Sequence, residues 1–184
     1  TVDNKNKVYL QRQNAGQALG SELTVDILET GTHTFPLGDV GGTIPSGTGV
    51  EVYLITFDAS SREDGRPTVS FSVTFEENVL GLIASNDNLD ASDSYFGFSY
   101  GSAVEERGLE AGDEVILSSD RKTLSGTLTI GSAPKIDQLR VIINKDTADI
   151  FNTSKASKLA AFNAWDEARR LVGVSAGDYT LRAR

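Results

Sequence analysis

The sequence has no cysteine, no methionine and a single histidine, His33. Without cysteine, the chain cannot form disulfides, zinc-thiolate sites, iron–sulfur clusters or a thiol nucleophile. One imidazole cannot build a metal site of several histidines, and no Gly-x-Ser-x-Gly motif is present to suggest a serine hydrolase. We therefore predict no catalytic residue and expect a protein that is not an enzyme, with a hydrolase as the least supported alternative.

Positive charge and long apolar runs are also scarce. The chain has 17 Lys and Arg against 26 Asp and Glu, a formal net charge of −9. Because no cluster of basic residues could follow a phosphate backbone, we expect no nucleic-acid partner. The longest apolar run, Val79–Ala84, is far shorter than the roughly 18 residues that a membrane-spanning helix requires. We therefore expect no transmembrane segment.

What the sequence does contain is a repeated alternation of apolar and polar residues, which is the pattern of half-buried β-strands. Thr68–Phe75 places Val and Phe on one face and Thr and Ser on the other. Leu23–Ile27 alternates in the same way. Val50–Phe57 is apolar on both faces, which predicts a central strand covered on both sides.

Turn residues separate further strand segments. Glu114–Leu117 and Thr123–Ile130 flank a polar stretch of hairpin length, 118–122, and Gln138–Asn144 is a further β-rich run. Short strands with turns at this spacing predict an all-β fold over residues 1–150. We expect a two-sheet antiparallel β-sandwich that is jelly-roll-like.

The last quarter of the chain has a different pattern. Lys155–Val172 contains neither Gly nor Pro, follows an N-cap residue at Ser154 and ends before Gly173. Its apolar residues recur at three- and four-residue steps, which predicts one C-terminal α-helix. We expect residues 151–184 to hold this helix and a terminal strand, packed on the sandwich or on a neighbouring subunit.

The middle of the chain, about residues 50–143, carries short motifs in a recognisable order. These are Val52-Tyr53-Leu54-Ile55, Phe57-Asp58, Val73-Thr74-Phe75, Leu80-Gly81-Leu82-Ile83, Leu89-Asp90-Ala91-Ser92-Asp93, Arg107-Gly108-Leu109-Glu110 and Ile136–Ile142. Together they resemble a domain of bacterial exported proteins that carry a PEP-CTERM sorting tail and are handled by exosortase. The resemblance implies export, a β-sandwich, and association with the cell surface or an exopolysaccharide matrix. It implies no catalytic residues.

The start of the sequence fits the same expectation. A chain without methionine that begins at Thr1 is what removal of a secretory signal would leave. The Pro-Glu-Pro motif, hydrophobic segment and basic tail of such proteins do not follow in this sequence. We expect a secreted or cell-surface bacterial protein.

The segment Ser85–Ser94 concentrates side chains with oxygen atoms. Calcium prefers six to eight oxygen ligands, and the candidate ligands are Asn86, Asp87, Asn88, Asp90 and Asp93. Their spacing differs from that of an EF-hand. Two interpretations remain open: a calcium site, with calcium as the only cofactor considered, and an exposed loop in which Asn and Asp form Asx turns.

Two further groups are candidates. Tyr95 and Tyr100 stand in an aromatic-rich stretch, where they could form a platform that stacks on sugar rings or could point into the core from a strand. Arg140 is expected to form a structural ion pair, with Asp58 as the first candidate partner and Glu110 as another. We expect this pair to lie at a sheet edge and to set the strand register.

These observations predict a non-enzymatic, exported structural or interaction subunit of the cell surface or extracellular matrix. Its expected partners are copies of itself or other surface proteins. An edge segment such as Val8–Gln11 or Tyr179–Arg182 could add to the sheet of a neighbour. The alternative function is a calcium-assisted carbohydrate-binding module that takes polysaccharide on residues 85–100.

Overall fold

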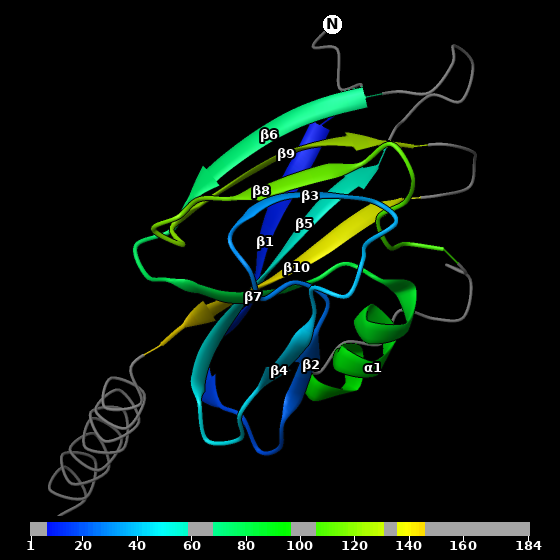
Figure 1. Ribbon diagram of the computed structural model, residues 1–184. Helices are drawn as coiled ribbons and strands as arrows, with labels where there is room; N and C mark the ends of the chain where they lie inside the picture. Colours follow the sequence, from blue (N-terminus) through cyan, green and yellow to red (C-terminus); the bar gives the residue numbers. More distant parts are fainter. Residues whose placement is uncertain (1–6, 59–67, 97–105, 131–135, 146–184) are drawn as a thin grey trace, which may run out of the picture. The chain divides into compact units, whose positions relative to one another are not determined.

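The computed structural model describes residues 7–58, 68–96, 106–130 and 136–145, which are coloured in Figure 1. The chain divides into two compact units, Thr1–Thr147 and Ala148–Arg184. All described residues belong to the first unit. The predicted helix Lys155–Val172 and the rest of the predicted domain 151–184 lie outside the described residues.

The described residues form ten strands and one helix. In chain order these are β1 (Lys7–Ala18), β2 (Leu23–Val25), β3 (Gly31–Thr34), β4 (Gly42–Ile44), β5 (Gly49–Asp58), β6 (Thr68–Thr74), β7 (Val79–Ile83), α1 (Asn86–Phe96), β8 (Glu114–Leu117), β9 (Thr123–Thr129) and β10 (Asp137–Asn144).

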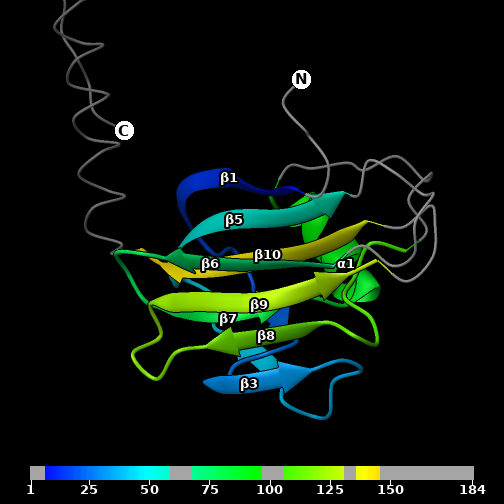
Figure 2. The same ribbon diagram turned by 90° about the horizontal axis from the view of Figure 1, so that it is seen from above.

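The strands are arranged in three sheets (Figures 1 and 2). Sheet A has the strand order β1-β5-β10-β7, sheet C has the order β3-β8-β9-β6, and the small sheet B pairs β2 with β4. Each of these pairings is antiparallel. The described part of the chain is therefore mostly antiparallel β-structure with one helix, which confirms the predicted fold class at that level.

A hydrophobic core joins sheets A and C. Sheet A contributes Ile55, Phe57, Leu139 and Val141, and sheet C contributes Val115, Leu117, Leu124 and Leu128. The apolar residues of β6 pack against this core but stay only half-buried, while the Ser and Thr residues between them are exposed. The alternation predicted for Thr68–Phe75 is thus confirmed, with the strand ending at Thr74.

A second core covers the opposite face of sheet A. There Val50 and Val52 of β5 pack with Leu89 and Phe96 of α1 and with the apolar residues of sheet B. Because Ile55 and Phe57 belong to the first core, β5 is buried on both faces and lies between β1 and β10. The prediction of a central strand at Val50–Phe57 is confirmed.

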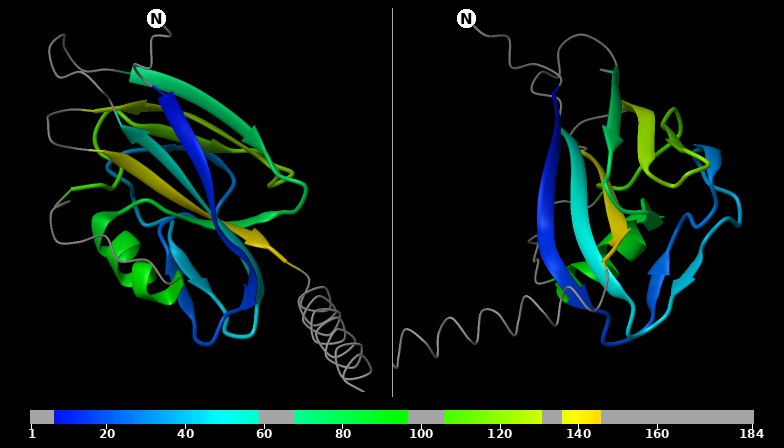
Figure 3. Two further views of the ribbon diagram at one scale, coloured as in Figure 1. Left: turned by 180° about the vertical axis from the view of Figure 1, so that it is seen from behind. Right: turned by 90° about the vertical axis from the view of Figure 1, so that its left-hand side faces the viewer.

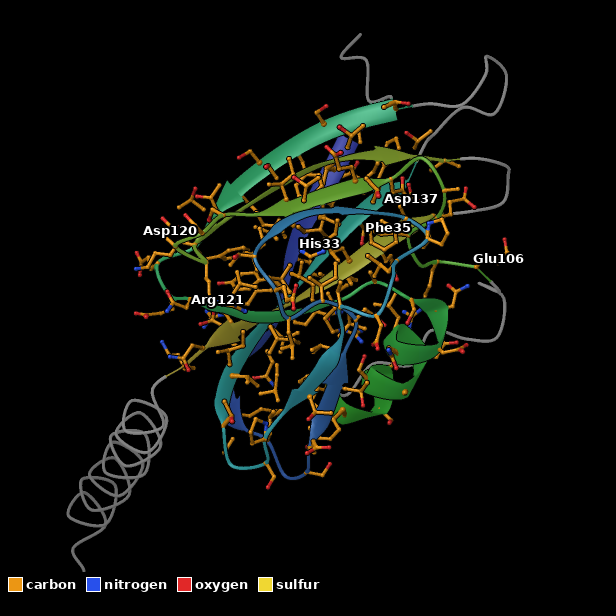
Figure 4. The ribbon with its side chains drawn as sticks, in the orientation of Figure 1. His33, Phe35, Glu106, Asp120, Arg121 and Asp137 are labelled. Atoms are coloured by element: carbon orange, nitrogen blue, oxygen red, sulfur yellow. The ribbon has the colours of Figure 1, made fainter. Side chains whose placement is uncertain are left out.

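The predicted hairpin is also present, since β8 pairs with β9. In the turn between them, Arg121 has a positive φ of 59°. Its guanidinium donates hydrogen bonds to the carbonyl oxygens of Val79 (2.8 Å), Leu80 (2.9 Å) and Leu28 (2.9 Å). Figure 4 shows Arg121 beside the end of the hairpin. The turn therefore occupies carbonyl groups of β7, the outer strand of sheet A.

Of the segment Ser85–Ser94, all residues from Asn86 onward belong to helix α1, so the interpretation as an exposed loop is wrong. Asn and Asp compete with the helix backbone for hydrogen bonds, which is why the composition indicated turns. The helix forms because its buried residues recur at helical spacing, at Leu89, Ser92, Asp93 and Phe96. Burial of this face against sheet A outweighs the weak local propensity.

One buried carboxylate ties the hairpin to its surroundings. Asp113, which is 2% exposed, accepts hydrogen bonds from the backbone N–H groups of Glu110 and Thr129, both at 2.7 Å. Burial raises the pKa of Asp113 above its ordinary value, more than the two N–H groups lower it. The folded protein therefore takes up a proton on Asp113 at a higher pH than the unfolded chain does.

This raised pKa predicts a pH-dependent difference between the wild type and an Asp113→Asn variant. The contribution of Asp113 to stability is fully present below the ordinary pKa of 3.8 and is lost as the pH rises through the raised value. The stability deficit of the variant should therefore be larger at acidic than at neutral pH in urea unfolding. An NMR titration in which Asp113 loses its proton at or below the ordinary pKa would contradict this.

Candidate functional site

Helix α1 is attached to sheet A by a buried cluster of two arginines around one carboxylate. Asp93 Oδ2 accepts from Arg107 Nη2 at 2.6 Å, and Asp93 Oδ1 accepts from Arg140 Nη2 at 2.5 Å. The two arginines are 1% and 0% exposed, respectively. A carboxylate shared between two guanidinium groups leaves one excess positive charge within the cluster, so further acceptors are needed.

Neighbouring oxygen atoms supply these acceptors. Arg107 donates from Nε to Asp90 Oδ1 at 3.0 Å and from Nη1 to Gln138 Oε1 at 3.1 Å. The carboxylate of Asp90 reaches the surface, with 68% of its side chain exposed. This second carboxylate balances the charge of the two arginines. Since Asp90 and Asp93 belong to α1 and Arg140 to β10, the cluster joins the helix to sheet A.

The acceptors around Arg140 come from the strand on one side and the helix on the other. Its Nε donates to Gln13 Oε1 of β1 at 2.8 Å, and its Nη1 donates to the backbone oxygen of Leu89 at 3.0 Å and to the hydroxyl of Ser92. The guanidinium carbon lies 5.6 Å from the centre of the Phe96 ring. Arg140 therefore links β1, β10 and α1, from an inner strand and not from a sheet edge as expected.

Three of the five predicted calcium ligands, Asn86, Asp90 and Asp93, accept hydrogen bonds from protein N–H groups in this structure. Asn86 Oδ1 accepts from the backbone N–H groups of Arg107 (2.7 Å) and Gly108 (2.6 Å). Asn88 donates through Nδ2 to Asp26, and Asp87 is exposed. Among the described residues, no three acidic or histidine side chains are grouped to hold a metal ion. Calcium binding stays a prediction.

The other predicted site residues are dispersed. The hydroxyl of Tyr95 accepts from the backbone N–H of Ser21 at 2.5 Å and donates to the backbone oxygen of Ser21 at 2.8 Å, so this ring holds α1 to the β1–β2 connection. Tyr100 and the side chain of Asp58 lie outside the described residues. His33 is buried on β3, opposite Val115, and its Nε2 lies 3.0 Å from the backbone oxygen of Glu29.

Strand β1 forms the outer edge of sheet A, which can be followed in both views of Figure 3. Its first half, Lys7–Arg12, pairs in unbroken register with Tyr53–Asp58, and register shifts begin after Arg12. Tyr9 and Leu10 are 55% and 46% exposed and are the exposed large hydrophobic residues of the described chain. This half of β1 therefore offers both an open backbone edge and apolar side chains.

A groove of about 500 Å³ lies beside this edge, between β1 and β5 of sheet A and β6 of sheet C. Arg12 and Glu51 form an ion pair there at 2.5 Å, and Tyr53 donates to Glu51 at 2.8 Å. Burial, followed by the hydrogen bond and negative charge of Glu51, raises the pKa of Tyr53. Leu10 and Phe75 also line the groove, so part of its wall is apolar.

The opposite edge of sheet A is covered. Leu82 of β7 donates to the backbone oxygen of Ile27 at 3.0 Å and accepts from the N–H of Asp26 at 2.8 Å. With the guanidinium of Arg121 on the neighbouring carbonyls, β7 has little edge left for another strand. Of the two edges of sheet A, β1 is the one that can accept a partner.

Several residues of these sites were not indicated by the sequence. Arg107, Gln138 and Gln13 join the cluster from three separate segments, and no local spacing relates them. The burial of Asp93 could have been predicted from the sequence, because it lies at helical spacing from Leu89 and Phe96, which are buried on the same face of α1. The edge position of Val8–Gln11 was anticipated.

Fold and site together define a class: a mostly antiparallel β-protein with a helix held to one sheet by a buried arginine cluster. Comparison with known proteins assigns the chain to no family, since no family model, no curated protein and no solved structure matches it. Within the described residues, no helix combines the length and the apolar character needed to cross a membrane.

Proposed function

We propose that the protein is an exported, non-catalytic subunit of the cell surface or extracellular matrix and that it associates with copies of itself through strand β1. In this proposal sheets A and C form the two layers of a β-sandwich, and the connections between the strands follow a jelly-roll-like topology. The shared core of the two sheets supports the layered arrangement. The resemblance of residues 50–143 to exported, sorted proteins supports the location.

The observation that carries the proposal is the exposure of Tyr9 and Leu10 on the unpaired edge of sheet A. Natural proteins usually protect such edges with proline, inward-pointing charges, bulges or a covering loop. Lys7–Arg12 contains no proline, its register shifts come only after Arg12, and the four residues between its charged ends carry no charge. An open edge with apolar side chains fits a strand from another chain.

A second copy is the partner that best fits this edge. A two-fold axis beside β1 would pair the same segment of two chains antiparallel, which is a self-complementary contact. Tyr9 and Leu10 lie at the middle of Lys7–Arg12, so each would approach the partner's apolar residues.

The test is the oligomeric state of wild type and a Leu10→Lys variant, measured by size-exclusion chromatography with light scattering over a range of concentrations. Lysine removes apolar contact from both subunits, a loss of about 2 kcal/mol for the pair, or roughly 30-fold in the dissociation constant. Thr43→Lys is the matched control, because Thr43 is an exposed residue of β4 and receives the same charge.

We expect wild type and Thr43→Lys to associate in the same concentration range and Leu10→Lys to associate only at roughly 30-fold higher concentration, with unchanged circular dichroism in all three. A wild type that is monomeric at every concentration would overturn the proposal. So would equal association of the Leu10→Lys variant, because the contact would then lie elsewhere.

A further inference from the structure

The outer face of sheet C has an unusual composition. In the register of β6 with β9, β9 with β8 and β8 with β3, the outward positions are all Ser or Thr except Glu114 and Ile116. The Ser and Thr residues are Thr68, Ser70, Ser72 and Thr74 on β6, Thr123, Ser125, Thr127 and Thr129 on β9, and Thr32 and Thr34 on β3. Figure 2 shows these four strands side by side.

This face is almost uncharged in a strongly acidic protein. Charged residues make up 23% of the chain, and a surface designed for solubility carries about 25–35% of them. Glu114 is the single charged residue at the outward positions of the four strands. A high β-propensity explains threonine but not serine, which is not among the residues enriched in strands. The absence of charge is therefore a property of this surface that strand formation does not require.

The hydroxyl groups are paired across the strands. Thr68 and Thr129 lie 3.1 Å apart, Ser70 and Thr127 lie 3.4 Å apart, and Thr74 and Thr123 lie 3.0 Å apart, each measured between hydroxyl oxygens. In each pair one hydroxyl donates to the other, so the pair still presents both a donor hydrogen and acceptor lone pairs outward. Pairing also restricts the side-chain rotamers, which lowers the entropy lost when a ligand binds.

The pairs form rows of fixed spacing. Neighbouring strands lie about 4.7–4.9 Å apart, and every second residue along a strand repeats after about 6.6–6.8 Å. Sheet C therefore presents a regular set of hydroxyl groups on β6 and β9 and further ones on β3, with Glu114 and Ile116 of β8 between them. A repeating polymer with its own hydroxyl groups can use many such rows at once, and this multiplies weak single contacts.

We propose that the outer face of sheet C binds a neutral polysaccharide chain. A nucleic acid would need Lys or Arg on this face, and an acidic polysaccharide would need them for the same reason. A protein partner would call for aromatic or Arg residues in an apolar centre, and Ile116 alone does not supply one. Sugar hydroxyl groups, in contrast, match the donors and acceptors that the rows present. This site is separate from β1, so the inference does not rest on self-association.

The experiment is co-sedimentation of the whole chain with insoluble cellulose, chitin and β-1,3-glucan, with alginate gel as the acidic comparison. The test variant is Ser125→Lys, at the centre of the face between Ser72 and Ile116. The matched control is Ser46→Lys, at an exposed position outside sheet C. Thermal unfolding establishes that both variants are folded.

We expect wild type and Ser46→Lys to sediment with at least one neutral polysaccharide and not with alginate. The Ser125→Lys variant should bind at least tenfold more weakly. No retention on any neutral polysaccharide, or equal retention of Ser125→Lys, would overturn the inference. Retention on ice crystals in place of polysaccharide would also overturn the inference, because the face would then bind ordered water. Loss of self-association in Ser125→Lys would overturn it as well, because the face would then bind a second copy of the chain. The Leu10→Lys variant should keep its polysaccharide binding, so failure of either proposal can be recognised separately.

Discussion

Replacing Arg140 by methionine is expected to lower the free energy of unfolding by about 3–5 kcal/mol, the usual cost of removing one partner from a buried ion pair. Arg140 is fully buried and donates to Asp93, to Gln13 and to the helix. Its removal leaves Asp93 Oδ1 without the guanidinium group that donates to it. Urea unfolding followed by circular dichroism measures the loss.

Two comparisons define what this result means. Arg12→Met removes an arginine from the half-exposed pair with Glu51, where we expect a loss of less than about 1 kcal/mol. A triple variant, Arg107→Met, Asp93→Leu and Arg140→Met, replaces the cluster by apolar side chains and should recover much of the stability. If Arg140→Met costs no more than Arg12→Met, the cluster does not hold the helix to the sheet.

Replacing Gly108 by alanine is expected to cost about 3 kcal/mol, at the upper end of the usual cost of overpacking. A Cβ atom at position 108 would lie 2.5 Å from the backbone oxygen of Ala84 and 2.7 Å from the backbone nitrogen of Asn86. Backbone atoms cannot move aside as a flexible side chain can. The segment that carries Arg107 would have to leave the start of α1, and Asn86 would lose its two N–H donors.

The measurement is again urea unfolding, combined with hydrogen exchange of the α1 amides, which should become faster in the Gly108→Ala variant. Gly38→Ala is the control, because no atom lies within 4 Å of a Cβ built at position 38. Its stability should change by less than about 0.5 kcal/mol. Unchanged α1 exchange in Gly108→Ala would show that this segment does not position the helix.

The strands that could be predicted are those whose alternation is strict. In β6, Val69, Phe71 and Val73 face the core and the residues between them face solvent, because side chains of a strand point alternately to its two faces. The doubly apolar run at β5 likewise required cover on both faces. For such segments the sequence of apolar and polar residues is enough to predict which side chains are buried.

Helix α1 could not be predicted in this way. Its residues Asn86, Asp87 and Asn88 have low helix propensity, and they favoured a loop. What makes the segment helical is the burial of Leu89 and Phe96 against sheet A, together with the arginines that bind Asp93. These partners lie far away in the sequence, so a local pattern could not show them.

The order of residues by itself determined that this protein is built of antiparallel strands, that thiol chemistry is absent and that Arg140 needs a carboxylate. Alternation, composition and the cost of an unpaired charge are properties of the chain alone. Tertiary structure decided that the carboxylate is Asp93, that β1 is an open edge and that the Ser and Thr residues of β3, β6 and β9 share one face. Each of these depends on which strands become neighbours, and pairing between distant segments is set by the packing of the whole fold.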